Sequence, residues 1–308
     1  MSARRRARGP ERIGPYVILG PLAEGGMAEL FRAQRVEGGP VVCLKRMRRE
    51  LCQDEELVAE LVREVELAVQ LDHANLVPVY DHGEDGGHYL VMQLVEGMDL
   101  ARLREARTLH PLRVAYVGVE LARALVYVHH SDPAKGRKPL VHCDVTPHNV
   151  LVGLDGTVKL SDFGLARALR KTGAETLTRT RGKPSYLSPE QRQGERIGSR
   201  SDLFSLGVVL WQALVGTHPY AEGPRPRKVM LEAWIHERTI ANARRTVAEA
   251  APEAPEALQR GIEGLLQRAP ERTARAEAVL EALVPLVESD AREALAAEVK
   301  LAMQERRP

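Results

Sequence analysis

Asp144, Asn149 and Asp162 carry the side chains of this sequence whose types and spacing could do chemistry. Apolar, strand-like runs follow Asn149 and precede Asp162, and the dipeptide Asp155-Gly156 between them predicts a tight β-hairpin. The hairpin would bring the three oxygen-bearing side chains into one small space. Such a cluster is costly unless a metal ion or a substrate proton uses it. The stretch therefore predicts a site for Mg²⁺ and phosphate.

The composition indicates a globular chain that can position such a site. Its 308 residues are 44% hydrophobic and 28% charged, enough for one large or two modest domains. A net charge of +2 is too small to favour nucleic acid or an anionic membrane as the main partner. No long apolar run predicts a membrane span or a signal peptide. Three cysteines without a CxxC pair suit a reducing compartment, so we expect a cytoplasmic protein.

The N-terminal third alternates between strand and helix patterns. Residues 1–12 contain five arginines without an apolar pattern, which predicts a disordered basic arm. Short β-type runs follow at residues 16–19, 29–33 and 41–47. Residues 54–71 have apolar positions at a helical period. We expect a small sheet with one accompanying helix.

The remainder of the chain is mainly helical by the same criteria. Residues 112–129 show a long amphipathic period, and residues 201–211 predict a buried helix that carries the charged Asp202. Residues 288–308 again have a helical period, which indicates a tail that is either packed on the domain or free to bind a partner.

The motif His142-x-Asp144, with Asn149 five residues later and then Asp162-Phe163-Gly164, resembles the catalytic and metal-binding loops of protein kinases. Each fragment alone is weak, but their order and separation together are specific. The resemblance implies that Asp144 orients the proton of a substrate hydroxyl. It also implies that Asn149 and Asp162 hold Mg²⁺.

Other segments extend this resemblance over residues 16–286. The stretch around Gly25 and Gly26 is similar to the glycine-rich loop that covers nucleotide phosphates, with Ala23 and Ala28 in place of its first and third glycines. Lys45 ends a strand similar to V-A-I-K, and the resemblance implies that it pairs with Glu64 of the following helix. The residues implied to bind the nucleotide are Leu22, Gly25, Gly26, Leu30, Cys43, Lys45, Glu64, Met92, Gln93, Val95 and Leu151.

Two later features match the family's lower lobe. Ser188-Pro189-Glu190 resembles the A-P-E end of the activation segment, and the resemblance implies an ion pair between Glu190 and Arg272. Asp202 matches the aspartate that anchors the backbone of the catalytic loop.

The fold implied is α+β, a bilobal protein kinase fold. It has a small N-lobe with an antiparallel sheet and the αC helix, and a larger, mainly helical C-lobe. We expect the kinase domain at residues 13–286, with the N-lobe at about 13–94 and the C-lobe at about 98–286. Residues 287–308 would form a helical C-terminal tail.

Three residues depart from the family pattern. Cys143 replaces the arginine that pairs with a phosphorylated activation loop, so phosphorylation there should be less necessary. Thr146 replaces the lysine that reaches the γ-phosphate, and Lys183 stands where a threonine usually faces the catalytic aspartate. We expect Lys183 to act as a catalytic cation that substitutes for the missing lysine.

The resemblance implies a bacterial, cytoplasmic Ser/Thr kinase that uses ATP and Mg²⁺ to phosphorylate protein substrates and itself, with a partner for the C-terminal helix left open. One alternative is a pseudokinase scaffold, which Ala23, Ala28 and Thr146 support. The intact set Lys45, Glu64, Asp144, Asn149 and Asp162 opposes it. A kinase of small-molecule hydroxyls is the second alternative, and the Glu190 and Arg272 features of a protein-substrate platform argue against it.

Overall fold

The computed structural model describes residues 11–25, 28–48, 52, 55–130, 139–162, 184–221, 224, 230–268 and 271–305, without the side chains of residues 55–57, 60, 61, 63, 64 and 232. They fall into two compact units. The N-terminal unit comprises residues up to 72 and residues 78–94, and the C-terminal unit comprises residues 73–77 and those from 95 onward. Among the helices of the described residues, none has the length and apolar character needed to cross a membrane.

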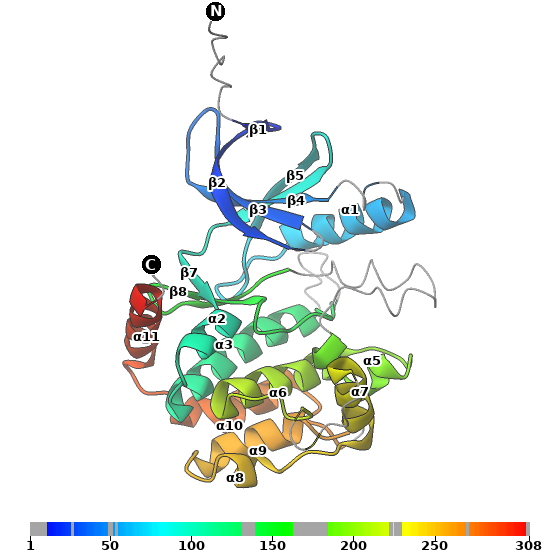
Figure 1. Ribbon diagram of the computed structural model, residues 1–308, viewed down its shortest axis with the longest axis vertical. Coiled ribbons are helices and arrows are strands. Elements are labelled where there is room, and N and C mark those ends of the chain that lie inside the picture. Colours follow the sequence, from blue (N-terminus) through cyan, green and yellow to red (C-terminus); the bar gives the residue numbers. More distant parts are fainter. Residues whose placement is uncertain are drawn as a thin grey trace, which may run out of the picture. The chain divides into compact units, whose positions relative to one another are not determined.

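The N-terminal unit is built on one antiparallel sheet (Figure 1). Its strand order is β1-β2-β3-β4-β6-β5. The predicted β-type runs at residues 16–19 and 29–33 are confirmed as the longer strands β2 Tyr16–Glu24 and β3 Ala28–Arg35, and the run at 41–47 is confirmed as β4 Val42–Met47. The sheet also contains β1 Arg12–Ile13, β5 Val79–Glu84 and β6 His88–Gln93. Arg12, the last residue of the expected basic arm, already belongs to β1.

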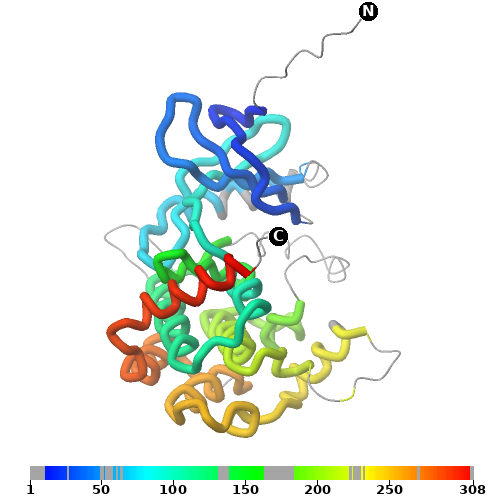
Figure 2. Tube along the Cα trace, turned by 60° about the vertical axis from the view of Figure 1, so that its left-hand side comes forward, coloured from blue at the N-terminus to red at the C-terminus, as the bar shows by residue number. Residues whose placement is uncertain are grey.

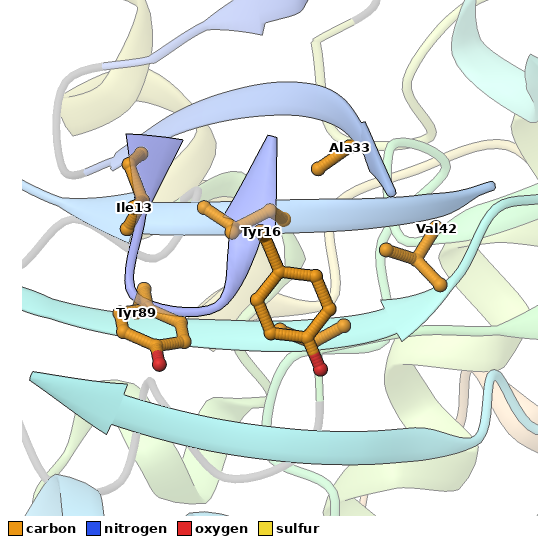
Figure 3. Close-up of a cluster of buried hydrophobic side chains, with 7 residues drawn as sticks. Ile13, Tyr16, Ala33, Val42 and Tyr89 are labelled. Carbon is orange, nitrogen blue, oxygen red and sulfur yellow. The ribbon is translucent and has the colours of Figure 1, made fainter. Parts of the chain in front are cut away.

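One face of this sheet forms the unit's apolar core. Alternation along the strands sends every second side chain to this face. The rings of Tyr16 and Tyr89 meet edge to face there with centroids 6.3 Å apart (Figure 3). The buried members of the cluster are Ile13, Tyr16, Ala33, Val42, Leu44, Tyr89 and Val91.

Helix α1, Glu55–Val69, belongs to the same unit and lies against β5. The predicted apolar stripe is confirmed at Val65 and Ala68, which are both buried. Leu71, just beyond the helix, is buried as well. Helix propensity alone would not hold so short a segment, so this buried stripe stabilises it.

The C-terminal unit is mainly helical, as expected (Figure 1). It also contains a small antiparallel sheet of β7 Gly97–Asp99, β8 Val150–Gly153 and β9 Val158–Leu160. Its helices and 3₁₀ turns are α2 Leu100–Ala106, α3 Pro111–His129, η4 Pro184–Tyr186, α5 Pro189–Arg192, α6 Ser199–Val215, α7 Leu231–Ala241, α8 Val247–Ala250, α9 Glu256–Leu265, α10 Ala276–Leu283, η5 Val284–Leu286 and α11 Ala291–Glu305.

Helix α6 is the centre of this unit, because all its residues from Ser201 to Leu214 are buried. Helices α3 and α9 pack against it, and Gly207 provides the space for close approach, since an added Cβ would meet the side chains of Leu265 and Leu266. The predicted long helix, α3, buries its apolar stripe completely at Leu121 and Leu125. The prediction of a buried helix carrying Asp202 is confirmed.

Candidate active site

The hairpin predicted between Asn149 and Asp162 is present as β8 and β9, joined by the turn at Asp155 and Gly156. Gly156 has a φ of +77°, the left-handed region that glycine adopts at little cost. Asp155 fixes the turn by accepting hydrogen bonds from the backbone N–H and the hydroxyl of Thr157. Local turn chemistry therefore accounts for this part of the site.

Asp144 and Asn149 form the centre of the site. The Asn149 amide Nδ2 donates to the Asp144 carboxylate at 2.7 Å and to the Asp144 carbonyl at 2.9 Å. The backbone N–H of Asn149 closes a turn onto the Thr146 carbonyl at 3.0 Å. Both donor bonds of the amide point at Asp144, so the amide oxygen Oδ1 is the atom left for a cation.

His142 links this loop to the residue that precedes Asp162. Its Nδ1 accepts from the Asp144 N–H at 3.2 Å, so its Nε2 is the protonated nitrogen that donates to the Ser161 carbonyl at 3.1 Å. Complete burial lowers the pKa of His142, although Asp202, Asp144 and Asp162 act in the opposite direction. His142 is therefore a neutral connector that lies within electrostatic range of both site carboxylates.

Asp202 anchors the loop from α6, as the resemblance implied. Its carboxylate accepts the backbone N–H groups of His142 and Cys143, each at 2.8 Å. His129, at the end of α3, contacts the same carboxylate through Nε2 at 2.9 Å. Asp202 is 1% exposed, so these bonds replace the water that a buried charge loses.

The oxygen donors of this site suit Mg²⁺. Asn149 Oδ1 and the Asp162 carboxylate are hard oxygen ligands, and Asp162 is held at a φ of +62° beside Ser161, whose N–H and hydroxyl donate to the Asn149 carbonyl. Within the described residues no group of three His, Cys, Asp or Glu side chains could hold a metal. Asn149 and Asp162 would therefore supply only two ligands, which fits an ion that takes its remaining ligands from phosphate and water.

Several residues expected to contact nucleotide share one face of the N-terminal unit's sheet. Leu30 lies opposite Lys45 between β3 and β4, and Cys43 lies opposite Met92 between β4 and β6. Directly paired residues project to the same face, and so do residues two apart on a strand. These four side chains therefore lie on the face opposite the apolar core.

Hydrogen bonds hold the glycine-rich turn at Gly25. Gly25 donates its N–H to the Ala28 carbonyl at 2.9 Å, and its own carbonyl accepts from Arg48 Nε at 2.9 Å. Arg48 also pairs with Glu24 at 3.0 Å. Ala28 lies in β3 without a positive φ, so alanine is accommodated at this position. Gly26 lies outside the described residues.

The other residues expected at the nucleotide site are placed in part. Leu22 is half-buried in β2, and Leu151 is half-buried in β8, where it pairs with Asp99. The Gln93 N–H donates to the Pro78 carbonyl, so this N–H is not available to a ligand. Val95 is half-buried in the segment before β7. The backbone of Glu64 lies in α1, but its side chain is outside the described part, and so are Lys183 and the Thr-rich segment 163–183.

The ion pair expected between Glu190 and Arg272 is present. Arg272 donates to the two carboxylate oxygens at 2.7 and 3.2 Å, and the Ser201 hydroxyl adds a third bond. Burial alone would raise the pKa of Glu190, but hydrogen bonds and charge from Arg272 lower it below its usual value. The Arg272 guanidinium also lies 4.9 Å from the ring centroid of Phe204. This network fixes α5 to the centre of the unit.

The segment 184–187, directly before α5, has every backbone carbonyl bound by a side chain. Arg192 donates to the carbonyls of Pro184 and Leu187 at 2.6 and 2.9 Å. His218 donates Nε2 to Ser185 at 3.0 Å, and the Ser205 hydroxyl donates to Tyr186 at 2.8 Å. Four successive residues of this segment are therefore fixed to the C-terminal unit by side-chain hydrogen bonds.

The sequence did not reveal the supporting roles of His129, Ser161, Ser205 and His218. Each acts through hydrogen bonds to residues that lie 12 or more positions away along the chain, and such bonds have no spacing that could be recognised. His142 was recognised as part of the motif, but its connecting role was not. Its position two residues before Asp144 was the only available signal.

The comparisons with known proteins agree with this fold. Residues 16–283 match the protein kinase domain family, and the chain belongs to this family. The kinase domain of PknI from Mycobacterium tuberculosis has the same fold, with a TM-score of 0.67 at 22% identity, and covers 91% of this chain and 99% of that one.

The curated relatives are bacterial serine/threonine-protein kinases. A probable member from Streptomyces coelicolor is 38% identical over 221 residues, which are 68% of this chain and 32% of that protein. PrkC of Bacillus subtilis is 35% identical over 209 residues, 67% of this chain and 31% of PrkC. The chain thus spans about a third of the length of these relatives.

Proposed function

We propose that the chain is an ATP-dependent protein kinase that transfers a γ-phosphoryl group to Ser or Thr hydroxyls of protein substrates, itself included, in the bacterial cytoplasm. The observation that carries the proposal is the 2.7 Å bond between Asn149 Nδ2 and the Asp144 carboxylate. It joins a candidate base to a candidate metal ligand in a loop that Asp202 anchors. Among the described residues, Cys43, Cys52 and Cys143 form no disulfide bond, which is consistent with a reducing compartment.

In this mechanism Asp144 accepts or orients the proton of the substrate hydroxyl while its carboxylate is held by Asn149. Mg²⁺, bound through Asn149 and Asp162, would neutralise charge on the transferred phosphate. Most of the barrier reduction comes from positioning and charge neutralisation, so rigid support of the loop matters more than covalent chemistry. Lys183 is proposed to supply a further cation.

Each unit contributes its own groups to nucleotide binding in this proposal. In the N-terminal unit, the face that carries Leu30, Cys43, Lys45 and Met92 would receive ATP, with Lys45 held by Glu64. Leu22, Gly25, Gly26 and Gln93 would complete that contribution. In the C-terminal unit, Val95 and Leu151 would contact the base. Segment 184–187, with its four bound carbonyls, would present the protein substrate.

The test is incubation with ATP, Mg²⁺ and a generic protein substrate, beside the Asp144→Asn variant. We expect phosphate on Ser and Thr of the substrate with the native chain and almost none with the variant. Nucleotide binding without transfer would indicate a scaffold instead. ATP consumption that requires a small hydroxyl compound and leaves proteins unmodified would indicate a small-molecule kinase.

A further inference from the structure

Helix α11 lies beyond the residues that match the protein kinase domain, and it packs on its own unit. Its buried residues form one stripe: Ala291, Leu295, Ala296, Val299 and Ala302. The helix lies against α2, α3, β7 and β8, and Figure 2 shows it in red beside the green segment. The structure therefore does not support an external partner for the apolar stripe of this helix.

The first turn of α11 contacts the turn between β8 and β9 directly. Arg292 donates Nε to the Asp155 carbonyl at 3.0 Å and Nη2 to the Asp155 carboxylate at 2.6 Å. Gly156 lies so close that an added Cβ would overlap the Arg292 carbonyl oxygen. The hydroxyl of Tyr116, in α3, donates to the Gly156 carbonyl at 3.4 Å. The turn is thus held by α3 as well as by α11.

The attachment of α11 comes mainly from its apolar stripe. Ion pairs flank the stripe, between Glu288 and Arg113 at 3.0 Å and between Glu305 and Arg107 at 3.5 Å. Their acidic partners are half exposed, and exposed ion pairs contribute little because water and salt screen them. Removing the buried stripe from its contacts is therefore the effective way to release the helix.

The contacted hairpin carries both proposed metal ligands. Asn149 directly precedes β8, and Asp162 follows β9 after one residue. The strands have only four and three residues, and hydrogen bonds from Ser161 to the Asn149 carbonyl join their far ends. A displacement of the turn would therefore be transmitted along two short, paired strands.

We propose that α11 is a positioning element of the catalytic unit, which holds the β8–β9 hairpin so that Asn149 and Asp162 keep the spacing that Mg²⁺ requires. Arg292 is its positioning residue. The expected effect on catalysis rests on the proposed function. The coupling between α11 and the hairpin does not depend on that function.

The experiment compares Leu295→Asp, which places a charge in the buried stripe, with Ala297→Asp, which places the same charge on the exposed side of the same helix. Hydrogen exchange of residues 150–162 is measured in the full chain without Mg²⁺ or nucleotide. We expect Leu295→Asp to increase exchange in the hairpin about tenfold and Ala297→Asp to leave it unchanged.

A second readout separates positioning from general stability. At a temperature where both variants are folded, Leu295→Asp should raise the Mg²⁺ concentration for half-maximal phosphoryl transfer several-fold, with a smaller loss of turnover at saturating Mg²⁺. Unchanged hairpin exchange after α11 itself has become exchangeable, or an unchanged Mg²⁺ requirement, would overturn the proposal.

If Leu295→Asp does not fold, Arg292→Ala still tests the proposal. Arg292 is half exposed, so its replacement by alanine leaves the buried stripe intact. It should increase exchange at residues 154–157, and Lys300→Ala on the same helix should not. Equal exchange in these two variants contradicts the positioning role. Absence of phosphoryl transfer in the native chain would refute the proposed function, and the exchange measurements would still decide the coupling.

Discussion

The carboxylate of Asp202, in the buried helix α6, accepts the backbone N–H of Cys143 at 2.8 Å. Cys143 has a φ of +65°, a conformation that costs a residue with a side chain about 1–3 kcal/mol. The same carboxylate also accepts the His142 N–H. One buried charge therefore holds the backbone N–H groups of two successive residues. The strained loop that presents Asp144 is therefore maintained by the centre of the C-terminal unit.

We expect Asp202→Asn to impair the loop. An amide offers one acceptor oxygen and turns an NH₂ group toward the second N–H, so one buried donor loses its partner. Such a loss costs about 1–3 kcal/mol, and turnover should fall further because Asp144 is mispositioned. Urea unfolding and phosphoryl-transfer assays measure the two effects. Glu253→Gln, on an exposed residue, is the control, and normal turnover in Asp202→Asn would contradict the anchoring role.

Glu190→Gln should be strongly destabilising. It leaves the Arg272 guanidinium, whose side chain is 0% exposed, without its counter-charge, and breaking a buried pair in this way costs about 3–5 kcal/mol. The matched control is Glu256→Gln, which breaks an exposed pair with Arg260 on α9 and should cost less than about 1 kcal/mol. Urea denaturation of both variants gives the comparison, and similar losses would show that the buried pair is not a main support.

His218 should make stability depend on pH. Burial lowers its pKa to about 4, with Arg192 and Arg104 acting in the same direction. The unfolded chain takes up this proton near pH 6.5, so the stabilising contribution is complete above that pH and is lost as the pH falls toward 4. The difference corresponds to at most about 3 kcal/mol.

Unfolding free energies measured between pH 7 and 4 for the native chain and for His218→Gln test this. The substitution should flatten the dependence in that range. Parallel curves for the two proteins would mean that His218 does not hold its neutral form in the folded state.

Lys183→Ala should reduce phosphoryl transfer far more than removal of a surface lysine. Thr146, where the family has a lysine, is 2% exposed and uncharged. We therefore propose that Lys183 supplies the missing cation at the γ-phosphate. Turnover of Lys183→Ala is compared with that of Lys300→Ala on the exposed side of α11. Near-normal turnover of the first variant would refute the compensation.

Local patterns account for most of the elements that were predicted. The stripe of α1, the buried character of α6 and the hairpin turn at Asp155-Gly156 follow from short-range periodicity and turn chemistry. The matching residues of the loops identified Asp144, Asn149 and Asp162 for the same reason, because their spacing along the chain is fixed.

The sequence alone determined the family, the order of elements and the chemical groups of the site, since these depend on residue types at fixed separations. The tertiary structure decided which remote groups hold them in place. Asp202 and Cys143 are 59 residues apart, and Arg292 and Asp155 are 137 apart. Such contacts arise from the packing of whole helices, and no local pattern records them. The same packing placed the apolar stripe of the C-terminal helix on its own catalytic unit.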